Sequence, residues 1–185
     1  MDRGAVIASL VGVGMAVTIG TSFLLIVPIE PVYWYLALPA GLLIGYYANA
    51  RSERAGGQWS RVLVNAVVAG LVTGLTFALL LLAVKALFFG ADAGYRDAST
   101  GGPLTCRTGA ECVYRRYLAA GQGDAFKSAG ITDVATFTTF YWGQQLGNAG
   151  LMLLFTTGGA LGGGLMFGFA KRHGPEGKSA GPDVA

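Results

Sequence analysis

Residues 146–170 read LGNAGLMLLFTTGGALGGGLMFGFA. This stretch has no charged side chain and contains eight glycines. At about 1.5 Å of rise per residue, a helix of this length crosses a bilayer core of about 30 Å. In water each glycine would cost a helix about 1 kcal/mol relative to alanine, but in lipid the backbone must satisfy its own hydrogen bonds. The stretch therefore predicts a transmembrane helix.

Glycines spaced four apart share one helix face and let another backbone approach closely. Within the quoted stretch we expect such packing pairs at Gly158 and Gly162, Gly159 and Gly163, and Gly164 and Gly168. Rows of small residues recur in the other apolar runs and include Gly12 and Gly20, Gly41 and Gly45, and Gly70 and Gly74. The rows predict a bundle packed through glycine.

Four apolar runs are present in the 185 residues, at about 5–27, 32–50, 62–89 and 142–170. Only 12% of the residues are charged, against about 25% in a typical soluble domain. The first run exceeds the roughly 7–15 apolar residues of a signal peptide and lacks its cleavage pattern, so we expect it to be retained. The expected fold is an all-α integral membrane protein with one domain of four transmembrane helices.

The loops predict an orientation. Three arginines lie in the short loop 51–61, and Lys171, Arg172 and Lys178 follow the last run, so these segments are expected on the cytoplasmic side. The protein is then expected in the cell membrane with both termini on the cytoplasmic side. Residues 173–185 are expected to form a disordered cytoplasmic tail. The polar segment 90–139 becomes a small outer segment between the third and fourth helices.

The two cysteines, Cys106 and Cys112, both fall in the predicted outer segment. Outside the cytoplasm such a pair is expected to form a structural disulfide. A redox-active pair or free thiols are the alternatives, although a redox pair is usually C-x-x-C. Metal binding would need further ligands, and the single histidine, His173, is predicted on the other side. No metal or other cofactor is expected.

Polar side chains near the start of the fourth run form the best candidate site. Gln144, Gln145 and Asn148 follow the i, i+3, i+4 pattern of one helix face. They are expected to make hydrogen bonds between helices or to line a small polar pathway near the outer mouth. Lys85 is expected to extend to the outer interface. Upstream, Thr132 or Asp133 predicts an N-cap for a helix that starts near Val134 and continues into the fourth span.

The net charge of +3 does not indicate nucleic-acid binding, because the basic residues flank apolar runs. No catalytic motif or pair of carboxylates in a polar pocket is recognised, so no enzymatic activity is expected. The leading hypothesis is a non-catalytic accessory or assembly subunit that acts through helix packing and its outer segment. Its expected partners are the lipid bilayer and either copies of itself or other membrane subunits. The alternatives are a small oligomeric transporter or channel, and a redox enzyme that uses the two cysteines.

Overall fold

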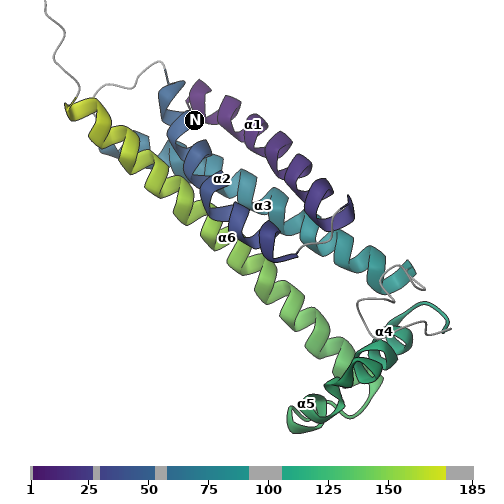
Figure 1. The fold of residues 1–185 in the computed structure, drawn as a ribbon. Helices are drawn as coiled ribbons and strands as arrows, with labels where there is room; N and C mark the ends of the chain where they lie inside the picture. The colour runs from purple at the N-terminus through teal and green to yellow at the C-terminus, as the bar shows by residue number, and fades with distance from the viewer. Residues whose placement is uncertain (1, 27–29, 53–57, 92–105, 174–185) are drawn as a thin grey trace, which may run out of the picture.

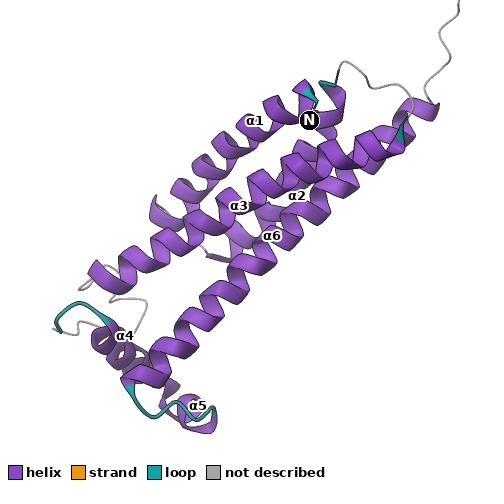
Figure 2. Cartoon of the chain, turned by 180° about the vertical axis from the view of Figure 1, so that it is seen from behind, coloured by secondary structure: helices purple, strands orange, loops and turns teal. Residues whose placement is uncertain are grey.

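The computed structural model describes residues 2–26, 30–52, 58–91 and 106–173. Within these ranges every regular element is a helix and none is a strand (Figure 2). The prediction of an all-helical fold is therefore confirmed. The four long helices are α1 (Arg3–Gly20), α2 (Glu30–Ala50), α3 (Trp59–Ala91) and α6 (Val134–His173). A π-helical segment at Thr21–Ile26 continues α1.

Three helical stretches are long and apolar enough to cross a membrane. They are Arg3–Ile26, Trp59–Ala91 and Val134–Ala170, with mean hydropathies of 2.0, 2.5 and 1.5. α2 has 21 residues, about 31 Å at the usual rise, but it is less apolar because tyrosines, Pro39 and Asn49 interrupt its aliphatic residues. The chain thus has the helices of a membrane protein.

The four long helices form three layers (Figure 1). α1 packs against α2 and α3, and α6 packs against the same two helices from the opposite side. The N-terminus, the end of α2, the start of α3 and the end of α6 lie together at one end of the bundle. α6 leaves much of its outer surface uncovered, because no helix of the described chain lies beyond it.

The interior of the bundle is built from alanines, glycines and a few large side chains. Tyr33 of α2 is fully buried and its hydroxyl donates a hydrogen bond to the Phe77 carbonyl of α3, at 2.7 Å. Near the other end of the bundle, the buried Asn49 amide of α2 donates to the Val62 carbonyl of α3, at 3.1 Å. These two bonds join α2 to α3 near both ends of α2.

A small head, residues 106–133 together with the first turns of α6, lies at the far end of the bundle (Figure 1). It contains α4 (Ala110–Tyr117), a π-helical turn at Leu118–Gln122 and α5 (Gly123–Ser128). Its core consists of Phe126, Ile131, Phe137 and Tyr141, with further rings from α3, α4 and α6 packed around them. The head therefore has its own apolar core.

A glycine turn connects α5 to α6. Gly130 has a φ of +74°, which favours glycine, and the Ile131 amide donates to the Phe126 carbonyl at 2.9 Å. The Gly130 amide donates to the Lys127 carbonyl at 3.1 Å, which completes a Schellman motif. Because Ile131 and Phe126 also pack together in the core, the turn fixes α5 against α6.

Asp133 caps α6. Its carboxylate accepts hydrogen bonds from the Ala135 and Thr136 amides, at 2.9 and 2.8 Å. The predicted start near Val134 is confirmed, and the helix continues without a break to His173. The helical run that contains the predicted span 142–170 therefore begins eight residues earlier, inside the predicted outer segment. Residues 92–105 of that segment and residues 174–185 of the predicted tail lie outside the described residues.

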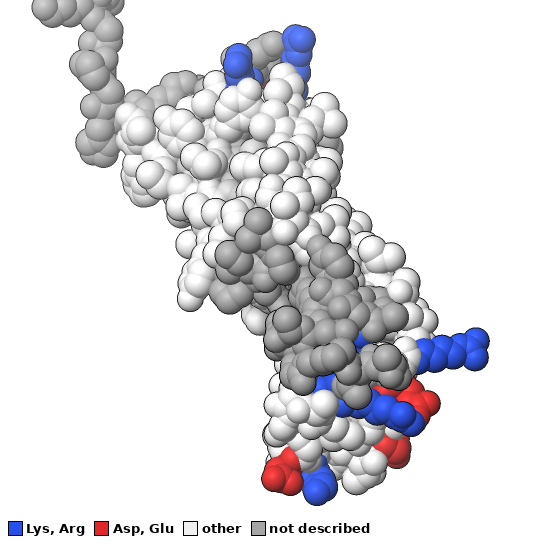
Figure 3. All heavy atoms as spheres, turned by 45° about the vertical axis from the view of Figure 1, so that its right-hand side comes forward, with Lys and Arg blue, Asp and Glu red and all other residues white. Residues whose placement is uncertain are grey.

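Figure 3 shows charged side chains at both ends of the face in view. Lys and Arg occupy both ends of this face, Asp and Glu gather at the head, and the described atoms in view between the ends are uncharged. An uncharged middle and polar ends are what a bilayer requires of a protein that crosses it.

Candidate functional site

The predicted polar cluster of α6 does not stay together. Gln144 is exposed, Gln145 is 4% exposed and Asn148 is partly buried. Consecutive residues of a helix point about 100° apart, so Gln144 faces outward while Gln145 faces the bundle. The sequence spacing grouped all three residues on one face, and the structure separates Gln144 from Gln145.

Gln145 lies opposite the end of α3 that is nearer the head. One turn before it on α6, the ring of Tyr141 packs 4.8 Å from the ring of Phe89. Phe89 lies one turn beyond Lys85 on α3. The helices α3 and α6 run in opposite directions, because Gly74 lies against Leu153 whereas the earlier residue Ala66 lies against the later residue Gly164. Lys85 and Gln145 are therefore at the same level of the bundle.

The Gln145 amide has an unsatisfied atom. Its Oε1 is buried and has no hydrogen-bond partner in the part of the chain that the structure describes. A buried acceptor without a partner costs about 1–3 kcal/mol, so such atoms are rare in stable proteins. This side chain is the one member of the predicted polar set that the fold encloses.

Ten of the twelve glycines predicted to pack lie against another helix. A Cβ added at Gly41 would overlap the backbone of Thr156, and one added at Gly45 would overlap the backbone of Ala160. At Gly70 it would lie 2.5 Å from the Ala160 side chain. The other seven, each with an atom of another helix within 4 Å of the added Cβ, are Gly12, Gly20, Gly74, Gly159, Gly163, Gly164 and Gly168.

Gly158 and Gly162 differ from the other ten glycines. A Cβ added at either would meet nothing within 4 Å. The neighbouring pair, Gly159 and Gly163, lies against α2 instead, where an added Cβ would overlap the carbonyls of Leu38 and Leu42. Gly158 and Gly162 thus contact no other helix of the described chain, and their packing against another chain stays a prediction. One step along a helix turns a residue by about 100°, which moves this pair away from α2.

The outer surface of α6 has a row of glycines that no helix of the described chain covers. Gly143, Gly147, Gly150 and Gly158 are all exposed, and an added Cβ at each meets nothing within 4 Å. These glycines are four, three and eight residues apart, which places them on one helix face. Leu154, which is 63% exposed, lies on the same face between Gly150 and Gly158. We call this surface the outer glycine face. Sequence spacing alone did not distinguish it from the packed rows.

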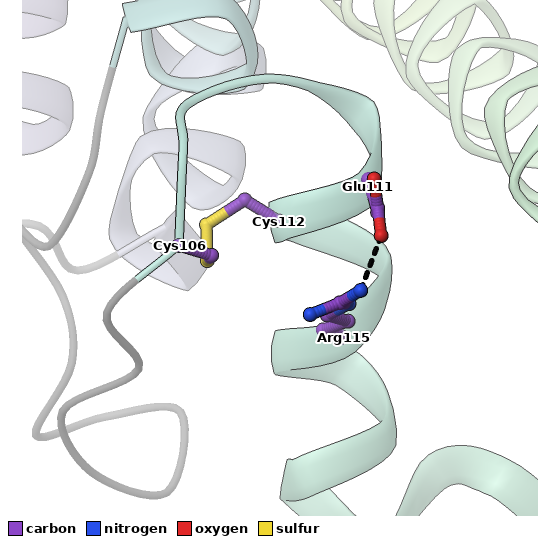
Figure 4. The surroundings of a disulfide bond; sticks show 4 residues. All are labelled: Cys106, Glu111, Cys112 and Arg115. Atoms are coloured by element: carbon purple, nitrogen blue, oxygen red, sulfur yellow. Dashed lines mark hydrogen bonds and ion pairs between the residues drawn. A yellow bond between two sulfur atoms is a disulfide. The ribbon is translucent and has the colours of Figure 1, made fainter.

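Cys106 and Cys112 lie at disulfide distance in the head (Figure 4). Their Cα atoms are 5.4 Å apart, and the bond joins the loop before α4 to the first turn of that helix. Cys112 is 1% exposed, while Cys106 is partly exposed. The exposed ion pair of Glu111 and Arg115 lies on the same helix. The Cys106–Cys112 disulfide therefore fixes the start of α4.

No metal-binding arrangement is present among the described residues, where no three His, Cys, Asp or Glu side chains come together. Comparison of the chain with protein-family models, with curated proteins and with solved structures finds no match. The candidate functional features of this chain are the outer glycine face, the buried amide of Gln145 and the head.

Proposed function

We propose that this chain is a non-catalytic, multi-pass membrane subunit that assembles with other chains through the outer glycine face and presents its head beyond the bilayer. In this proposal α2 is the fourth span. The end of the bundle that holds Arg3, Arg51 and Arg61 is cytoplasmic, and the head is outside, where Cys106 and Cys112 are oxidised. The basic residues near short connections support this orientation.

The observation that carries the proposal is the outer glycine face. In lipid, a row of glycines stabilises a helix bundle where another backbone approaches it closely enough for van der Waals contact. On the packed sides of the bundle another helix makes that contact, as at Gly41 against Thr156. On the outer face, Gly143, Gly147, Gly150 and Gly158 gain no such contact in the single chain. A further helix against this face would supply it.

The length of α6 gives a second argument. Its 40 residues extend about 60 Å, whereas α2 extends about 31 Å. Because the helix continues unbroken into the head, it rigidly joins the outer glycine face to the aromatic core around Phe137. A partner on this face would lie beside both the bundle and the head.

Assembly is tested by replacing two outer glycines, Gly147→Leu together with Gly150→Leu, and measuring the mass of the complex extracted from native membranes. The matched control is Gly14→Leu on α1, where an added Cβ also meets nothing within 4 Å. We expect wild type and the control to remain in a larger complex and the double variant to separate as one chain with unchanged helix content. A wild-type protein that is extracted as a single chain would overturn the proposal. So would an equal loss of the larger complex in the double variant and in the Gly14→Leu control.

A small oligomeric transporter or channel is the second candidate, and the buried Oε1 of Gln145 favours it. A polar atom enclosed at the level of Lys85 is what a pathway would need near its outer mouth. Liposome flux of potassium, chloride and glycerol should then fall in Gln145→Leu and Asn148→Leu but not in Gln144→Leu. Equal flux in all three variants and wild type would exclude these residues from transport.

A further inference from the structure

We draw no further inference here: the strongest candidate, the uncovered outer glycine face of α6, belongs to the surface already used in the proposed function, and nothing in the structure shows whether a second copy of this chain or another protein covers it.

Discussion

The hydroxyl of Tyr33 is the clearest single stabilising group at the scale of one residue. It is buried between α2 and α3 and donates to the Phe77 carbonyl, and the two rings also meet edge to face at 5.4 Å. We expect Tyr33→Phe to lower the free energy of unfolding in mild detergent by about 1 kcal/mol, because it removes the hydrogen bond but keeps the ring. Tyr35→Phe is the control, since Tyr35 is 79% exposed. Equal loss in both variants would contradict this assignment.

Asp133 links stability to pH. Hydrogen bonds from the Thr136 backbone amide and hydroxyl, and then from the Ala135 amide, hold the pKa of its carboxyl below the usual 3.8. A pKa that is lower in the folded state means that the charged form stabilises the fold. The contribution is complete above the ordinary Asp pKa and is lost as the pH falls through the folded value.

We expect the first turn of α6 to fray as the pH falls below about 3.8. The measurement is the hydrogen-exchange protection of the Ala135 and Thr136 amides across this range. Asn caps a helix about as well as Asp but does not titrate, so protection in Asp133→Asn should be independent of pH there. The same acid-induced loss in the Asn variant would show that another group is responsible.

At the scale of one element, α6 places two neighbouring glycines in opposite environments. Gly159 lies against the Leu38 carbonyl of α2, whereas Gly158 faces outward. Gly159→Ala should destabilise the bundle by about 1–3 kcal/mol, because the added methyl overlaps backbone that cannot move aside cheaply. Gly158→Ala should leave a detergent-solubilised single chain unchanged or up to about 1 kcal/mol more stable. Thermal unfolding of the two variants measures this difference. A larger loss of stability in Gly158→Ala than in Gly159→Ala would contradict the finding that Gly159 faces α2 and Gly158 faces outward.

The same two residues show what the sequence can predict. The spacing of glycines indicated that α6 packs closely, but Gly158 with Gly162 and Gly159 with Gly163 have identical spacing. The choice between them depends on how the helix is rotated toward α2, which is a tertiary contact and leaves no local signal. The start of α6 was predictable because Asp133 acts locally, through amides only two and three residues away.

The candidate polar site was predicted less well for a related reason. Gln144 and Gln145 are adjacent and chemically identical, so only burial separates them. The structure encloses Gln145 and exposes Gln144, because Tyr141, one turn before Gln145, packs against Phe89 of α3. That ring contact joins positions 52 residues apart, and no sequence pattern marks it.

At the scale of the whole molecule, the separation of the two polar ends predicts a defined sidedness. Arg3, Arg51 and Arg61 lie at one end of the bundle, beside its termini and the short loop 51–61, whereas in the head Arg115 pairs with Glu111 and Lys127 lies 3.6 Å from Asp124. Since basic residues near short loops favour the cytoplasmic side, the head is expected outside.

Cysteine labelling tests this sidedness. Ser60 at the start of α3 and Thr132 in the head are both exposed, and α3 runs between the two ends that they mark. A membrane-impermeant maleimide should label Thr132→Cys in intact cells and Ser60→Cys only after permeabilisation. Wild type should stay unlabelled without a reductant, because Cys106 and Cys112 are paired. Labelling of Ser60→Cys alone in intact cells would reverse the orientation. Labelling of both positions from one side would mean that α3 does not cross the membrane, and the four-span arrangement would then fail.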